Sequence, residues 1–290
     1  MAPFRPRALP PVAQAGLTAV AALRALGGPA VFPKGHFTRH VPAISRWFVP
    51  PSAAGSSVWT VSPSLVRGCP PVTVPVEATI PAGLPSQAQF TQSHLPLPLF
   101  LEYLSQPRQQ PSALPALYLA QYPLDAGSPL ASAFTPPPPP LPSTAGQTPS
   151  PTLWLGTSTT ATSPLHRDPL ANVFVHLAGG KAVRMFSPES GERILGRLLG
   201  AHVAKKKIRG QEMMAGEERA KVDEFVWQEN AEPASEDEAG YEVTVGSGDG
   251  VYIPAGWWHA VRAVHEVDEK TGVEGVCASV CLAFPNRMYR

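Results

Sequence analysis

The 290-residue chain has few cysteines, few charged residues and no long apolar run, and each scarcity excludes a class of protein. Its three cysteines, Cys69, Cys277 and Cys281, form neither a disulfide framework nor a C-x-x-C pair, so we expect an intracellular, reducing compartment and no structural zinc. Charged residues make up 16% of the chain and the net charge is +1. The chain therefore has no strong positive electrostatic potential of the kind that would indicate nucleic-acid binding. No run of about eighteen apolar residues is present, so we expect a soluble protein without a membrane-spanning helix.

Acidic residues are also missing from the N-terminal quarter, because Glu77 is the first acid of the chain. In this region Arg5, Arg7 and Arg24 flank an Ala/Leu-rich segment, Val12–Leu26. The pattern is typical of a mitochondrial transit peptide, whereas the low serine content favours an ordinary N-terminal helix that packs on the domain. We therefore expect a cytoplasmic or nuclear protein, with mitochondria as the alternative.

Proline is abundant, with 36 residues, and it breaks the first half of the chain into short elements. The residue pattern predicts a strand over Thr73–Ile80, a short helix over Leu99–Leu104 and a buried strand over Ala116–Gln121. Residues Ser132–Pro151 are rich in proline and predict an exposed, extended connector. We divide the chain into an N-terminal segment (1–28), an α/β part (29–128), a proline-rich loop (129–151) and a β core (152–290).

The β core is predicted from short alternating strands separated by Gly, Pro and Asp turns, a texture typical of a sandwich or barrel. A charged insert at about 189–240, with one helical piece, interrupts it and is predicted to form mostly solvated loops. The basic patch Lys205–Lys207 in this insert is too short to indicate RNA binding. The predicted strands are Asn172–Leu177, Ala182–Phe186, Tyr241–Val245, Val251–Ile253, Ala260–Val264 and Val276–Leu282.

Three polar residues of the β core form a candidate metal site. His166 and Asp168 lie two positions apart, and at the end of an extended strand this spacing lets both side chains point to the same side. His259 follows 93 positions after His166 (259 − 166), at the end of the strand segment Gly248–His259, and a closed β-sandwich can bring such distant residues together. Two histidines and one carboxylate are the facial triad of non-haem Fe(II) oxygenases, which leaves open positions for a chelating cosubstrate and O₂.

Lys181 is the fourth candidate site residue, because it lies 15 positions after His166 (181 − 166) on what we predict to be the far strand of a Gly179–Gly180 hairpin. Its ammonium can then return toward the metal site, and a buried lysine requires an anion. The distal carboxylate of 2-oxoglutarate is such an anion. Neutral hydrogen bonds around it can come from Tyr118, Ser163 and Asn172, although buried groups of this kind are more often satisfied core residues.

These motifs resemble a known family. The segments LWLGTSTTATSPLHRDPLANVFVHLAGGKAVRMFSP and GDGVYIPAGWWHAVRA are similar to the core of Jumonji C domains of the small protein-hydroxylase group, which includes asparaginyl, arginyl and lysyl hydroxylases. The resemblance covers roughly residues 115–290, with weaker similarity at Pro29–Pro33 and Val74–Glu77. It implies a mainly β, cupin-like jelly roll, or double-stranded β-helix, with an N-terminal α/β extension.

The resemblance also implies an activity. His166, Asp168 and His259 would be the catalytic Fe(II) ligands, and 2-oxoglutarate would be held by Tyr118, Ser163, Asn172 and Lys181. With O₂, the enzyme would convert 2-oxoglutarate to succinate and CO₂ while it hydroxylates a side chain of a protein or peptide substrate. One departure concerns the last strand, where this chain has Ala283 in place of the tryptophan of the group's V-x-F-W pattern, and this change affects the wall of the pocket.

Three other functions are compatible with the same residues. The alternatives are a lysine demethylase, an RNA hydroxylase and a non-catalytic cupin that binds a metal. The chain has no cysteine cluster of the kind that accompanies chromatin readers, which favours hydroxylation over demethylation. We expect a protein partner and neither a membrane nor a nucleic acid, and the sequence leaves the oligomeric state undetermined.

Overall fold

The computed structural model describes residues 7–9, 27–52, 55–80, 89–107, 115–124, 127–128, 130–131, 134, 150–200, 216–228 and 240–284. Three predicted features, the segment Val12–Leu26, most of the proline-rich loop and the patch Lys205–Lys207, lie outside these residues. The end of the predicted connector is wrong, because Ser150 and Pro151 pair with the last strand of the chain and so belong to a strand. Among the described residues no helix is long and apolar enough to cross a bilayer. Cys69, Cys277 and Cys281 are all free thiols.

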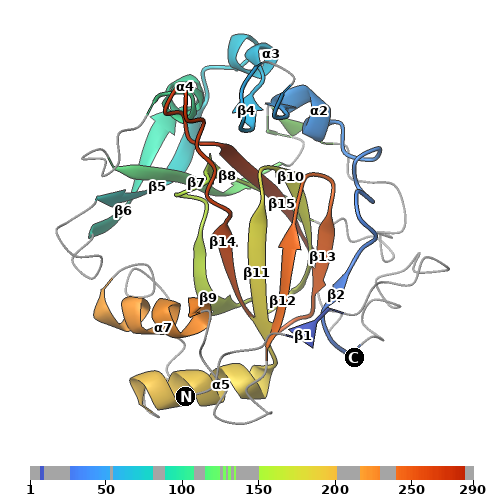
Figure 1. Ribbon diagram of the computed structural model, residues 1–290, viewed down its shortest axis with the longest axis vertical. Coiled ribbons are helices and arrows are strands. Elements are labelled where there is room, and N and C mark those ends of the chain that lie inside the picture. Colours follow the sequence, from blue (N-terminus) through green and yellow to red (C-terminus); the bar gives the residue numbers. More distant parts are fainter. Residues whose placement is uncertain are drawn as a thin grey trace.

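Two β-sheets form the body of the molecule (Figure 1). The five-stranded sheet has the order β1 (Arg7–Ala8), β12 (Tyr241–Val245), β11 (Lys181–Phe186), β14 (Trp258–Ala263) and β9 (Ser163–Arg167). The eight-stranded sheet has the order β2 (Ala30–Val31), β13 (Gly250–Ile253), β10 (Ala171–Ala178), β15 (Val276–Phe284), β8 (Ser150–Thr157), β7 (Ala116–Pro123), β5 (Thr73–Ile80) and β6 (Gln89–Pro96). A small third sheet pairs β3 (Phe48–Val49) with β4 (Thr60–Val61).

The chain changes sheet at almost every step through the β core. Strands β8, β10, β13 and β15 belong to the eight-stranded sheet, and β9, β11, β12 and β14 belong to the other. This exchange is typical of a jelly roll, and it confirms the predicted mainly β, cupin-like fold.

The predicted Gly179–Gly180 hairpin is wrong. β10 pairs with β13 and β15, whereas β11 pairs with β12 and β14, so the two glycines connect one sheet to the other. Gly179 has a φ of 77°, and a Cβ on it would lie 2.7 Å from the carbonyl oxygen of Val276, so the close crossing requires glycine. Lys181 therefore follows a sheet-to-sheet crossing, and its strand faces the inner surface of the opposite sheet.

The predicted strands are otherwise confirmed, and they include both alternating strands such as β5 and fully buried ones such as β10 and β13. Thr73–Ile80 and Tyr241–Val245 match their strands residue for residue, and the remaining strands and the Leu99–Leu104 helix differ at their ends by at most two residues. In β5 the buried positions are Val74, Val76 and Ala78, every second residue. The alternation places these apolar side chains in the largest core cluster or at its border.

Five described helices accompany the sheets: α2 (Ala43–Trp47), α3 (Pro63–Arg67), α4 (Leu97–Leu104), α5 (Pro188–Leu199) and α7 (Glu217–Trp227). Helix α4 buries Leu97, Phe100, Leu101 and Leu104, which share one face at helical spacing. Helices α5 and α7 lie beside the lower end of the five-stranded sheet in Figure 1 and fall in the charged insert, whose described residues form these two helices.

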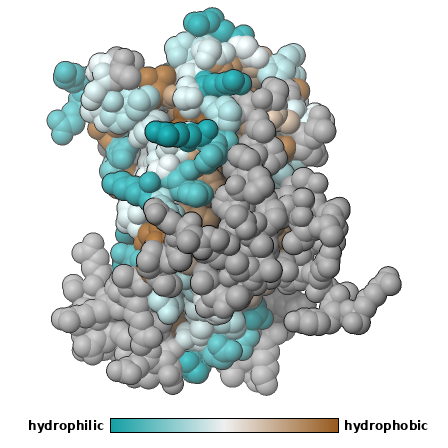
Figure 2. Space-filling model, turned by 90° about the vertical axis from the view of Figure 1, so that its right-hand side faces the viewer, coloured by the Kyte–Doolittle hydropathy of each residue, from teal (hydrophilic) through white to brown (hydrophobic). Residues whose placement is uncertain are grey.

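The surface is mixed in character over the described residues. Figure 2 shows hydrophilic and apolar residues interspersed over the described part of one face. Only four large apolar side chains among the described residues are exposed, namely Val66, Ile80, Leu99 and Val264. Two of them lie near the ends of strand β6: Ile80 ends β5 opposite Gln89, and Leu99 lies in α4 just after Pro96.

Helix α5 supports the strand that carries His259. Gly191 of α5 is buried, and a Cβ on it would lie 2.1 Å from Cδ1 of Trp258, the residue next to His259. We expect Gly191→Ala to destabilise the protein by about 1–3 kcal/mol, because the indole must move within a packed core. Chemical denaturation measures this. The neighbouring exposed variant Glu192→Ala, which loses only a surface ion pair with Arg167, should change stability by less than about 1 kcal/mol. Equal effects of the two variants would contradict the packing argument.

Candidate metal centre and its cavity

Paired strands β9 and β14 bring the three predicted metal ligands together. His166 and His259 are cross-strand partners, and their ring centroids lie 4.1 Å apart. β9 ends at Arg167, and Asp168 follows it directly, so its carboxylate lies on the same side as His166. The donor atoms of the three residues all lie within 4.8 Å of one another, and among the described residues they form the only such group of three.

Backbone carbonyls set the orientation of both imidazole rings. Nδ1 of His166 lies 2.7 Å from the carbonyl oxygen of Pro164, and Nδ1 of His259 lies 3.2 Å from that of Trp257. A carbonyl oxygen only accepts, so each Nδ1 carries the hydrogen and each Nε2 keeps a lone pair. This is the arrangement in which outer partners orient metal-binding histidines. Both imidazoles therefore offer Nε2 to the shared space.

The electrostatics of the centre suit a cation. Burial, followed by the neighbouring His166, lowers the pKa of His259 to about 3, so this imidazole is neutral and its 3.8 Å contact with Oδ2 of Asp168 is not an ion pair. Metal bonds to such donors are about 2.0–2.2 Å long. Donors on adjacent octahedral corners then lie about 3 Å apart, so small side-chain movements would close the site around an ion. The donor set fits a divalent iron.

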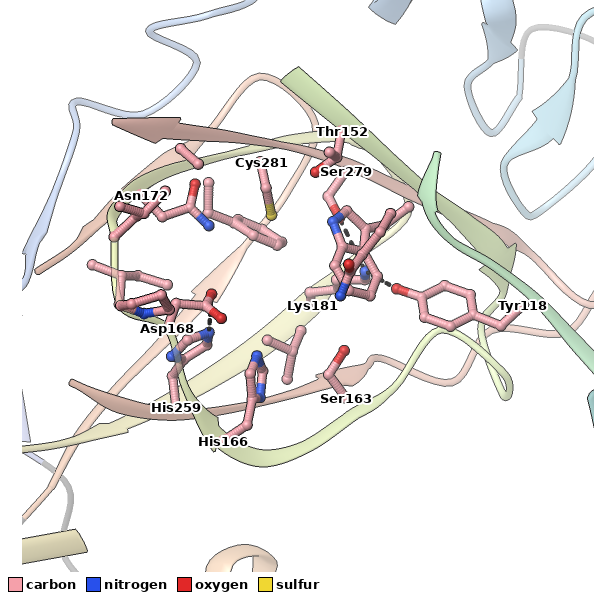
Figure 3. Close-up of a pocket in the computed structure, with 18 residues that line it drawn as sticks. Tyr118, Thr152, Ser163, His166, Asp168, Asn172, Lys181, His259, Ser279 and Cys281 are labelled. Carbon is pink, nitrogen blue, oxygen red and sulfur yellow. Dashed lines mark hydrogen bonds and ion pairs between the residues drawn. The ribbon is translucent and has the colours of Figure 1, made fainter. Parts of the chain in front are cut away.

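A cavity of about 210 Å³ opens beside the three ligands, between the inner faces of the two sheets. Figure 3 shows His166, Asp168 and His259 grouped at one end of it and Lys181 with Tyr118 at the other. The volume is below the about 300–1,000 Å³ of drug-sized sites, which suits a small ligand. All seven predicted site residues line this cavity: Tyr118, Ser163, His166, Asp168, Asn172, Lys181 and His259.

Lys181 is buried, with 1% exposure, and its ammonium has hydroxyl partners in place of an acid. Nζ donates to the hydroxyl of Tyr118 at 3.3 Å and to Oγ of Ser279 at 3.1 Å. No carboxylate among the described residues pairs with it. Burial lowers the pKa of Lys181, and Cys277 and Cys281 partly oppose this effect. An ammonium has three donors, so one remains for a further acceptor at this end of the cavity.

Tyr118 reaches Lys181 because the neighbouring strand has no side chain in its way. A Cβ on Gly156 would lie 2.8 Å from Cδ2 of Tyr118. Burial, followed by Cys277 and Cys281, raises the pKa of Tyr118 well above its usual value. The phenol therefore keeps its proton and remains a hydrogen-bond donor.

Asn172 lies on β10 toward the metal end of the cavity, and its Oδ1 is buried without a hydrogen-bond partner in the described part of the chain. Ala283 is its cross-strand partner and also lines the cavity. The small side chain at 283 leaves the adjacent space open where a tryptophan would fill it. Cys281 lines the same wall, and burial raises its pKa to about 11, so its thiol stays neutral.

Sequence reasoning missed three polar lining residues, Gln121, Thr152 and Ser279. Ser279 is part of the predicted strand Val276–Leu282, for which the sequence indicated no role in the site. The alternation of that strand places residues 279, 281 and 283 on one face, and this signal would have found Ser279 once the face was known to look into the cavity. His176, in the predicted strand Asn172–Leu177, is buried with 0% exposure.

The fold and the site together define a jelly-roll domain with a candidate His-Asp-His metal centre. A family model described as a cupin-like domain matches residues 78–283, more than half of the chain, and the chain belongs to this family. The family contains Jumonji C domains and includes 2-oxoglutarate-dependent oxygenases. No curated protein matches the chain.

Removing any one ligand should abolish tight metal binding and leave the fold intact. We expect His166→Ala, Asp168→Ala and His259→Ala each to lose bound Fe(II), because two remaining donors cannot hold an ion firmly. Metal content after dialysis measures the loss, and circular dichroism checks the fold, which depends on apolar burial. His265→Ala, at an exposed histidine, is the matched control and should bind metal like the wild type. Normal metal content in all three ligand variants would contradict the assignment.

Proposed function

We propose that the protein is an Fe(II)- and 2-oxoglutarate-dependent dioxygenase that hydroxylates a side chain of a protein or peptide. The observation that carries this proposal is the buried ammonium of Lys181, which lacks an acid partner among the described residues and lies in the same cavity as the His-Asp-His centre. A buried charge without a counter-ion is costly. A dianionic cosubstrate with one end on the metal would supply that counter-ion.

Strand register gives the length that such a cosubstrate must span. His259 pairs with Met185 and Lys181 pairs with Ala263, so four residues separate the two levels along the five-stranded sheet. At about 3.3 Å per residue this is about 13 Å. The extended lysine stem covers part of it, and the remainder suits a five-carbon dicarboxylate. Tyr118 and Ser163 line the same end and can donate to the distal carboxylate.

The metal end has the features needed for chemistry. Three protein ligands leave three positions of an octahedral ion open, which is what a chelating 2-oxo acid and O₂ require. When bound, Fe(II) supplies the oxygen chemistry that couples decarboxylation of 2-oxoglutarate to hydroxylation of a C–H bond. His166 and His259 hold their ring orientation through backbone carbonyls, and Asn172 offers an amide beside the open positions.

The substrate would approach from the side of Asp168. The side chain of Asp168 is 45% exposed, whereas that of His259 is 5% exposed, so the centre is open toward solvent on the carboxylate side. Lys181 at the other end is buried. A side chain of a polypeptide can enter from the open side while the cosubstrate occupies the closed one, which favours a protein or peptide substrate.

Neutralising Lys181 should weaken cosubstrate binding and leave metal binding unchanged. Lys181→Met keeps the aliphatic stem and removes the charge, and losing one member of a buried ion pair costs about 3–5 kcal/mol. That corresponds to a loss on the order of 10²-fold or more in 2-oxoglutarate affinity. Isothermal titration of the metal-loaded protein measures it. Lys270→Met, at an exposed lysine, is the control and should bind normally. Unchanged 2-oxoglutarate affinity in Lys181→Met would contradict the proposed role of Lys181 as the counter-ion of the cosubstrate.

Turnover separates the competing functions. We expect the Fe(II)-loaded protein to form succinate with captured partner polypeptides, to add one oxygen atom to a peptide by mass spectrometry, and to lose both activities in Asp168→Ala. Formaldehyde release would indicate a demethylase, and oxygen added to RNA would indicate an RNA hydroxylase. A protein that binds Fe(II) and 2-oxoglutarate but forms no succinate with any partner would be a non-catalytic cupin.

A further inference from the structure

Strand β6 is the last strand of the eight-stranded sheet, and its outer edge has no strand partner within the described part of the chain. It pairs on one side with β5, in an unbroken register from Thr73↔Pro96 to Ile80↔Gln89. No other strand of the described chain pairs with it, and no described residue bonds to its outer backbone groups. A row of N–H and C=O groups is therefore available to another strand.

This edge strand is exposed on both faces. Six of its eight residues are exposed and the other two are half-buried. By contrast, its neighbour β5 buries every second residue. β6 therefore contributes little to the core, and its ladder to β5 is its main attachment to the molecule.

The usual protections of an edge strand are missing from β6. Natural edge strands carry charges, prolines or bulges that prevent pairing with another chain. The sequence QFTQSHLP contains no Lys, Arg, Asp or Glu, and its one proline is the last residue. The pairing with β5 contains no bulge. An eight-residue, uncharged edge without a bulge is suited to strand addition.

We propose that β6 pairs in antiparallel fashion with β6 of a second copy of this chain, about a two-fold axis at Gln92. The two eight-stranded sheets then form one continuous sheet across a symmetric dimer. This inference is independent of the proposed dioxygenase activity, because β6 contributes no residue to the cavity.

Self-pairing fits the composition of the strand. A two-fold interface places the same surface against itself, so charged residues on the axis would oppose like charges. β6 has none. With the axis at Gln92, Phe90 of each copy lies across from His94 of the partner subunit, and aromatic cross-strand pairs of this kind are stabilising.

Two exposed apolar side chains lie near the two ends of β6. Ile80, 42% exposed, ends β5 beside Gln89, and Leu99, 55% exposed, lies in α4 just after Pro96. Antiparallel pairing brings the Gln89 end of β6 in one copy beside the Pro96 end and α4 of the other, next to the exposed Leu99. A single strand pair is smaller than the about 800 Å² per partner of a stable interface, so the dimer is reversible and concentration-dependent.

Sedimentation of the full-length protein over a dilution series tests the proposal. The wild type should shift from monomer to dimer as concentration rises. Gln92→Lys and Gln92→Glu each place two like charges on the axis and should weaken dimerisation at least about tenfold. An equimolar mixture of the two variants should recover the dimer, because Lys then faces Glu. Gln228→Lys, at an exposed glutamine of the α7 C-cap, is the control and should dimerise normally.

Three results would overturn the proposal. A wild-type protein that remains monomeric at every concentration has no such dimer. A dimer that persists in both Gln92 variants uses another surface. A mixture of the variants that stays monomeric, while circular dichroism shows that both are folded, excludes a two-fold axis at Gln92.

Discussion

The burial of the Lys181 ammonium is the constraint on which the rest of the site depends. A charge at 1% exposure requires partners, and here they are hydroxyls from the opposite sheet, Tyr118 on β7 and Ser279 on β15. Gly156 leaves space for the Tyr118 ring. The two sheets must therefore close over Lys181 at a fixed distance, and the cavity between them keeps a polar end.

The metal end is built differently, because its geometry comes mainly from the backbone. The β9–β14 pairing fixes the relative positions of the two histidines, and carbonyl oxygens two residues before each histidine orient the rings. β9 is the edge strand of its sheet, and Asp168 lies just beyond its end. The carboxylate is therefore partly exposed to solvent, whereas Lys181 stays buried.

The N-terminal part extends the eight-stranded sheet beyond the jelly roll. β7 still contributes Tyr118 to the cavity, β5 buries one face, and β6 is almost entirely exposed. Burial thus decreases with each strand away from the site. The eight-stranded sheet therefore closes one side of the cavity with β7 and ends, among the described strands, at the β6 edge, whereas the metal ligands come from the other sheet.

The amino-acid sequence alone located most strands of the β core, because two-residue alternation and turn residues act locally, but it did not locate β6 or β8. It also predicted His166, Asp168, His259 and Lys181 as site residues, since residue type and spacing limit the chemistry they can perform, and the structure places all four on one cavity. It did not reveal that Gly179–Gly180 crosses between sheets, or that Ser279 meets Lys181 across 98 positions. Alternation states which face of a strand is buried but not which sheet it joins, and only the closed sandwich decides which faces meet.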